Sequence, residues 1–203
     1  MSKIRHFIEQ SWLLIVSSFC FGLLIAIASA AWSPRIEQNE RDKRNNLMKE
    51  LITDANSFEV AAEGVEVPAR KGKLSKTDIY KAVDNEGRSI GFAFIAVGSG
   101  FADKIKLVIA VDERCEKFFG FKVLASNETP GFGDKIKEDY LGNQFKGVPA
   151  GELGLVKTGD DKKIDSEIVA ISGATVSSKA VVDIFNAYIE KIREHLQTKG
   201  FVE

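Results

Sequence analysis

The chain reads Ser172-Gly173-Ala174-Thr175-Val176-Ser177-Ser178 where a β-rich segment runs into a strongly amphipathic helix. Apolar residues then recur at helical spacing as far as about Thr198, which predicts that the helix packs on a sheet. The first turn of a helix presents unpaired N–H groups and a partial positive charge, and both suit a phosphate. The Thr175 hydroxyl at this point could also bond to a phosphate covalently.

The same residues fit an ordinary helix start. Ser172 would then cap the helix and Gly173 would provide the turn. Ser177 and Ser178 would lie exposed in the first turn. The spacing of these residues leaves both interpretations open.

A second motif lies upstream, after a strand pattern, and reads Glu128-Thr129-Pro130-Gly131-Phe132-Gly133. By itself a Pro-Gly sequence indicates an ordinary turn. Taken together and in this order, the two motifs resemble the FMN-binding subunits of Rnf and Nqr electron-transport complexes. The resemblance covers most of the chain, from the N-terminal hydrophobic segment to the C-terminal helix. The short chain is more similar to the G subunit of Rnf than to the longer C subunit of Nqr.

The resemblance implies that FMN is attached to Thr175 through a phosphoester bond. It also implies that Glu128 and Thr129 lie beside the flavin. The remaining cofactor-binding positions would be Ser172, Gly173, Ala174, Ser177 and Ser178. Many members of the family carry an acidic residue six positions before the modified threonine, where this chain has Val169. A flavin transferase that reads the acidic residue would act less well here.

The function implied is that of a membrane-anchored flavoprotein that relays electrons within an ion-translocating ferredoxin:NAD oxidoreductase complex of the Rnf type. Its partners would be the other membrane and peripheral subunits and a flavin transferase. The sequence shows no nucleophile–base arrangement and no second nucleotide motif, so we assign no catalytic residue. The alternatives are an FMN-binding regulatory or sensor protein outside such a complex, and a structural extracytoplasmic domain without flavin.

Composition argues against several other functions. The formal net charge is −1 and the basic residues are scattered, which does not suggest a nucleic-acid surface. The two cysteines, Cys20 and Cys115, are far apart and form no Cys-x-x-Cys motif. The two histidines, His6 and His195, lie near opposite ends of the chain. We therefore expect no metal site and no internal disulfide.

An uncharged run from roughly Gln10 to Pro34 is long enough to cross a bilayer as a helix. Trp12 and Trp32 stand near its ends, where aromatic rings favour the membrane interface. The alternative is a signal peptide cleaved after residues 28–30. The resemblance implies a single-pass protein of the cytoplasmic membrane whose flavin domain faces the periplasm. The excess of Lys and Arg just after the span argues for the opposite orientation.

We thus expect an α+β protein with an N-terminal transmembrane helix and one FMN-binding domain, in which an antiparallel-rich sheet packs on helices. Its predicted parts are a cytoplasmic tail (1–9), the transmembrane helix (10–34), a stalk helix (35–62) and the extracytoplasmic domain (63–203). Within the domain we predict an irregular connection, a hairpin around Asp84–Gly87, and a short helix capped by Asp134. The connection should run over 64–77, the strands over 79–83, 89–97, 105–111, 119–124, 153–157 and 163–171, and the short helix over 134–145.

Overall fold

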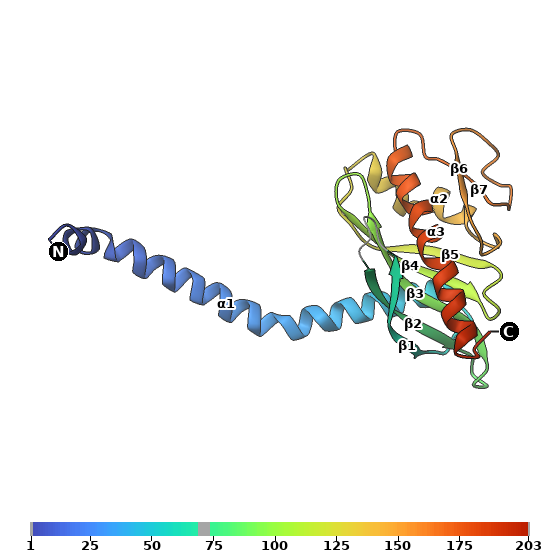
Figure 1. Ribbon diagram of the computed structural model, residues 1–203, viewed down its shortest axis with the longest axis horizontal. Coiled ribbons are helices and arrows are strands. Elements are labelled where there is room, and N and C mark those ends of the chain that lie inside the picture. Colours follow the sequence, from blue (N-terminus) through green and yellow to red (C-terminus); the bar gives the residue numbers. More distant parts are fainter. Residues whose placement is uncertain (1, 69–73, 203) are drawn as a thin grey trace. The chain divides into compact units, whose positions relative to one another are not determined.

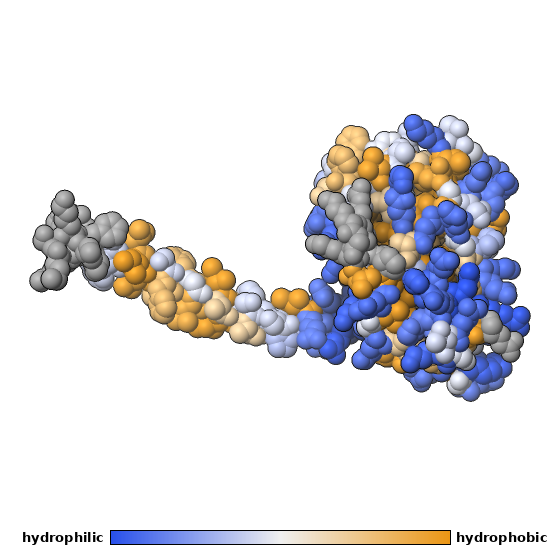
Figure 2. Space-filling model, viewed as in Figure 1, coloured by the Kyte–Doolittle hydropathy of each residue, from blue (hydrophilic) through white to orange (hydrophobic). Residues whose placement is uncertain are grey.

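The computed structural model describes residues 2–68 and 74–202 and divides into two units, 1–43 and 44–203. The first unit is formed by most of helix α1, which spans Ser2–Leu51 and contains Pro34. From Trp12 to Trp32 this helix carries exposed apolar side chains, and polar side chains follow them toward residue 43 (Figure 2). Part of the helix within Ser11–Leu51 is long and apolar enough to cross a membrane, and its most apolar window has a mean hydropathy of 2.4.

Helix α1 ends earlier than the predicted stalk helix. It stops at Leu51, and residues 57–62 belong to strand β1 (Ser57–Pro68). The expectation of a helix over 35–62 is therefore wrong at its C-terminal end. Over residues 57–60, Phe58 and Val60 alternate with the exposed polar side chains of Ser57 and Glu59, which suits a strand at the edge of a sheet.

The second unit is built on a five-stranded antiparallel sheet in the order β1-β2-β3-β4-β5. The other four strands are β2 (Leu74–Val83), β3 (Ser89–Ser99), β4 (Lys104–Asp112) and β5 (Phe118–Ser126). The predicted hairpin between β2 and β3 is confirmed. The Asp84 carboxylate accepts hydrogen bonds from the N–H groups of Glu86 and Arg88 at 2.8 and 2.9 Å, and Gly87 adopts a φ of 80°.

The expected irregular connection over 64–77 is wrong. Residues 65–68 pair with residues 74–77 as the ends of β1 and β2. Bulges between Val60 and Ala62, and again between Ala62 and Val65, interrupt the alternation of β1. Gly64 lies in this irregular stretch with a φ of 64°, and its N–H donates to Asp78 at 2.9 Å. The bulges explain why the strand periodicity is weak.

Helix α3 (Thr175–Thr198) covers one face of the sheet, with the boundaries that the sequence predicts (Figure 1). Gly98 of β3 lies so close to Ile184 that a Cβ at this glycine would collide with the isoleucine side chain. The Tyr188 hydroxyl accepts a hydrogen bond from the Val97 N–H at 3.1 Å. These contacts hold the helix at a fixed position on the main hydrophobic core.

The opposite face of the sheet carries a smaller core that includes the end of α1. Met48 and Ile52 are buried there against alanines of the sheet, Ala82, Ala93 and Ala110. The Arg44 guanidinium lies 4.7 Å from the centre of the Tyr80 ring. Residues 44–52 therefore belong to the folded domain.

The segment between β5 and α3 contains short elements. These are the 3-10 helix η2 (Gly133–Lys137), helix α2 (Asp139–Gln144), and a parallel pair formed by β6 (Gly154–Val156) and β7 (Glu167–Val169). The single helix predicted over 134–145 is wrong, because Glu138 is extended with a ψ of 150° and separates two elements. Asp134 lies inside η2 and does not cap it through its side chain. The strands predicted over 153–157 and 163–171 are present but shorter.

Candidate functional site

Helix α3 begins without a side-chain cap. Its N-cap is Ala174, and Ser172 is exposed and makes no capping hydrogen bond. Gly173 adopts a φ of 80°, which turns the chain just before the helix and suits glycine. The interpretation in which Ser172 caps the helix is therefore wrong, because the N-cap position is two residues later, at Ala174.

Thr175 is the first residue of α3 and is partly exposed. Its hydroxyl makes no hydrogen bond to any residue that the structure describes. The first helical backbone bond runs from the Ser178 N–H to the Ala174 carbonyl at 2.8 Å. The N–H groups of residues 175–177 precede that bond and have no acceptor within the helix. A free hydroxyl thus lies at the positive end of a long helix.

Ser177 and Ser178 are buried, with exposed fractions of 2% and 0%. The expectation that an ordinary helix start would leave them exposed is wrong. Ser178 accepts a hydrogen bond from the Ile171 N–H at 3.1 Å, and Ser177 donates to the Glu128 carboxylate. Both hydroxyls therefore have protein partners on the side of the helix that faces the domain.

The second motif forms a tight turn. The Thr129 carbonyl accepts hydrogen bonds from the N–H groups of Phe132 and Asp134 at 3.2 and 3.3 Å. Pro130 and Gly131, the latter with a φ of 76°, occupy the central positions, as in a type II turn. Thr129 is exposed and Glu128 is buried, so consecutive residues of the motif face different surroundings.

The tertiary structure brings the two motifs together. Besides the bond between Glu128 and Ser177, a Cβ built on Gly133 would stand 2.6 Å from the Ser177 hydroxyl oxygen. Gly173 faces Phe132, with 3.7 Å between a Cβ built on the glycine and the phenylalanine ring. The loop after β5 and the start of α3 are thus packed directly against each other.

Two opposing influences act on the pKa of the Glu128 carboxylate. Burial is the largest influence on its pKa and raises it, but several hydrogen bonds to the carboxylate act in the opposite direction. The donors are the Ser177 hydroxyl and the backbone N–H groups of the turn between β3 and β4, and together they hold the pKa of Glu128 below its ordinary value. A buried carboxylate with a lowered pKa therefore lies close to the first turn of α3.

A groove of about 440 Å³ lies between the end of β3 and the N-terminal half of α3. Its floor is largely apolar, and Val176, the residue after Thr175, is one of its walls. Lys179 lines the groove and pairs with Asp183 at 2.6 Å. The volume falls in the range of small-molecule sites in proteins.

The β3–β4 turn, residues 100–103, is part of this region, and the sequence did not reveal it. It reaches Glu128 only because the β3–β4 hairpin lies beside β5 in the sheet. The glycines at positions 98 and 100 are the one local signal, since closely spaced glycines can mark a close approach of backbones.

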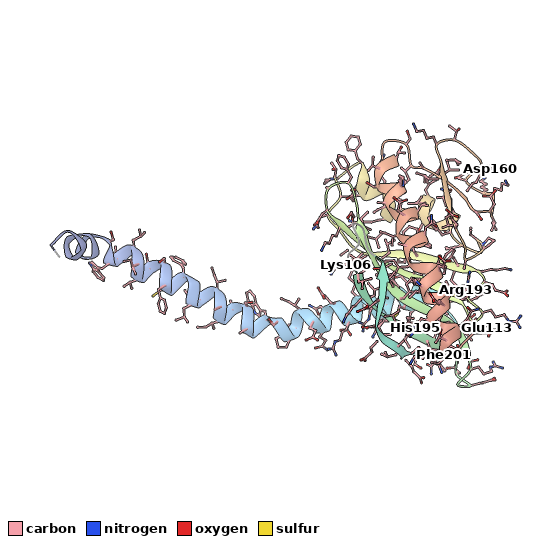
Figure 3. The ribbon with its side chains drawn as sticks, in the orientation of Figure 1. Lys106, Glu113, Asp160, Arg193, His195 and Phe201 are labelled. Atoms are coloured by element: carbon pink, nitrogen blue, oxygen red, sulfur yellow. The ribbon has the colours of Figure 1, made fainter. Side chains whose placement is uncertain are left out.

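Two polar side chains near the end of α3 lie away from this site. Figure 3 shows Arg193 and His195 on the C-terminal half of α3, far along the helix from its first residue, Thr175. Over residues 11–68 and 74–202, no group of three or more His, Cys, Asp or Glu side chains could hold a metal ion. Cys20 and Cys115 are both free thiols.

Comparisons with known proteins find similarity over the region that contains both motifs. Residues 100–190 match the family described as FMN-binding domain, and this range contains both motifs. The chain is 28% identical over 179 residues to the G subunit of the proton-translocating ferredoxin:NAD(+) oxidoreductase complex of Clostridium ljungdahlii, covering 88% of each chain. It is 27% identical over 192 residues to the G subunit of the ion-translocating oxidoreductase complex of Methanosarcina acetivorans, covering 95% and 97% of the two chains.

The fold is also found in solved structures. NqrC of Shewanella oneidensis superposes with a TM-score of 0.58 at 20% identity, over 72% of this chain and 73% of that one. The C subunit of the Na(+)-translocating NADH-quinone reductase of Parabacteroides distasonis gives the same score at 19% identity, over 79% and 94%. The predicted fold class, an apolar N-terminal helix followed by an antiparallel sheet packed on helices, is confirmed.

Proposed function

Since residues 100–190 match the FMN-binding domain family, we propose that the chain is the flavin-carrying G subunit of an Rnf-type ion-translocating oxidoreductase complex. It is anchored by α1 and carries FMN through a phosphoester bond to Thr175. The similarity to the G subunits of such complexes over most of the chain supports this assignment over a free-standing sensor protein. The other redox and membrane subunits of such a complex are its partners.

The observation that carries the attachment site is the free hydroxyl of Thr175 at the start of α3. The nearby N–H groups and the helix dipole stabilise a phosphate at this position. Gly173 has no side chain, and Ser172, the residue before it, is exposed. These residues fit the phosphate end of FMN.

The flavin, when bound, supplies one- and two-electron redox chemistry. The protein contributes a rigid attachment point, because α3 is packed along the sheet. The exposed Thr129 side chain is free to meet the cofactor, and the groove beside Val176 is a cavity within reach of the attachment point. In this proposal the chain relays electrons between neighbouring centres and needs no acid–base catalyst of its own.

Intact-mass spectrometry of the chain purified from its membrane tests the attachment. The mass should exceed that of the polypeptide by about 440 Da, the mass of FMN less one water. Thr175→Ala should abolish the adduct and the yellow colour of the denatured protein. Thr198→Ala at the other end of α3 is the matched control and should keep both. An adduct that persists in Thr175→Ala contradicts the assignment.

Co-purification tests the assembly. Mild detergent extraction should recover this chain together with integral membrane redox subunits. A flavinylated chain that purifies alone under every mild condition would favour the regulatory or sensor function.

A further inference from the structure

The Glu128 carboxylate joins three segments that lie far apart in the sequence. One oxygen accepts a hydrogen bond from the Ala102 N–H at 3.0 Å, in the turn between β3 and β4. The other oxygen accepts the hydrogen of the Ser177 hydroxyl, in the first turn of α3. Glu128 itself belongs to the loop after β5, and it is only 5% exposed. Both oxygens therefore have protein donors, and little of the carboxylate is open to a ligand.

Two glycines form the space that the carboxylate occupies. A Cβ on Gly100 would collide with the oxygen that faces Ala102, and a Cβ on Gly133 would stand 2.7 Å from the other oxygen. Neither glycine has a positive φ, so steric contact is the reason for a small residue here. The carboxylate thus fits a slot that tolerates no side chain on either side.

Further contacts hold the same segments. The Asn127 amide donates to the Asp103 carboxylate at 3.0 Å, which joins the loop after β5 to the β3–β4 turn a second time. On α3, Ser178 is bound to Ile171 while the adjacent Ser177 is bound to Glu128. The first turn of the helix is therefore held by hydrogen bonds from two directions.

We propose that Glu128 is a positioning residue for flavin attachment: through Ser177 it holds the first turn of α3, and with it Thr175, against the β3–β4 turn, without contacting the cofactor. This inference rests on the proposed function, in which Thr175 is the attachment point. It replaces the expectation that the Glu128 side chain lies beside the flavin. The hydrogen bonds to its two oxygens, more than its charge, are what position the helix.

The test follows how fast the full-length chain gains the flavin adduct after induction in a host that attaches it, measured by intact mass. Glu128→Ala should slow attachment by at least about tenfold, since a displacement of about 1 Å at a reacting group can cost about a hundredfold in rate. Glu128→Gln keeps one oxygen for Ala102 and presents an amide to Ser177, so it should stay within about threefold of the unchanged chain. Ser177→Ala removes the same hydrogen bond from the helix side, and it should slow attachment by the same factor as Glu128→Ala. If Glu128→Ala does not fold, Ser177→Ala provides the test.

Gln144→Ala is the matched control. Gln144 is also 5% exposed, and it joins α2 to β7 through hydrogen bonds with the N–H and carbonyl of Val169 at 2.8 and 3.2 Å. Its loss should destabilise the domain without slowing attachment. Equal slowing in Gln144→Ala would overturn the proposal, because lost stability would then explain the effect. An unchanged rate in Glu128→Ala, or a Glu128→Gln chain as slow as Glu128→Ala, would also overturn it.

Amide hydrogen exchange gives a second readout that needs no flavin. In a Thr175→Ala background, adding Glu128→Ala should speed exchange at Ala102 and Ser178 and leave Val169 unchanged, whereas Gln144→Ala should do the reverse. No change at Ala102 and Ser178 would overturn the positioning role. If the unchanged chain carries no adduct, the proposed function fails, and the exchange result still reports on Glu128.

Discussion

Gly133 lies against Ser177, and a Cβ built on this glycine would stand 2.6 Å from the serine hydroxyl oxygen. The same Cβ would stand 2.9 Å from the Cβ of Glu128. The two motifs lie far apart in the sequence, yet in the folded domain they meet with no room for one additional carbon.

Gly133→Ala should lower the free energy of unfolding by about 1–3 kcal/mol, the usual cost of overpacking a close contact. Thermal unfolding of the full chain in detergent measures it. Gly151→Ala is the control, because nothing lies within 4 Å of a Cβ at that glycine. Its effect should stay within about 0.5 kcal/mol. Equal stability of the two variants would contradict the close packing at Gly133.

Met48→Ala should destabilise the domain by about 2–5 kcal/mol, because the Met48 side chain is fully buried beneath the sheet and its loss leaves a cavity. Asn46→Ala, on an exposed position of the same helix, should have little effect. Chemical denaturation followed by near-ultraviolet circular dichroism would measure both. A neutral Met48→Ala would show that the end of α1 contributes nothing to the fold.

Because of the buried thiol of Cys115, the stability of the domain should fall at alkaline pH. Burial, the largest influence, raises the pKa of this thiol from 9.0 to about 11. The unfolded chain releases the thiol proton at lower pH than the folded chain, so deprotonation favours unfolding. The contribution of the buried, protonated thiol to the free energy of unfolding is therefore complete below pH 9.0 and is lost as the pH rises toward 11. Between about pH 9 and pH 10 the loss should be about 1 kcal/mol. Cys115→Ala should show a shallower decline over this interval, and parallel curves would contradict the raised pKa.

The resemblance to Rnf and Nqr subunits implies that the flavin domain lies outside the cytoplasm, and we expect this orientation. With Cys20 and Cys115 replaced, Asn85→Cys at the exposed β2–β3 turn should react with a membrane-impermeant thiol reagent once the outer envelope is permeabilised. Ser2→Cys should react only after the cytoplasmic membrane is broken. The reverse pattern would place the domain in the cytoplasm, as the basic residues that follow the span suggest.

Local sequence was sufficient for elements that form from neighbouring residues. The turn at Asp84–Gly87 was predictable because its hydrogen bonds stay within the turn, and α3 was predictable because its apolar residues keep a helical period. Strand β1 was not predictable, since its bulges break the alternation of side chains along the strand and since its pairing partner, β2, begins only at Leu74. The sequence predicts one helix where the structure has two short elements over 133–144, because no Gly or Pro signals the extended backbone at Glu138.

The sequence by itself determined that a threonine stands at the start of a long amphipathic helix, and it identified the two motifs. Only the tertiary structure decided what each residue of the motifs does. It buries Ser177, Ser178 and Glu128 and leaves Thr129 exposed, because sheet pairing brings the β3–β4 turn and the loop after β5 together, and packing of α3 on that sheet presses the helix start against them. Which polar side chain finds a hydrogen-bond partner in the protein, and which stays free for a ligand, depends on these long-range contacts and not on local spacing.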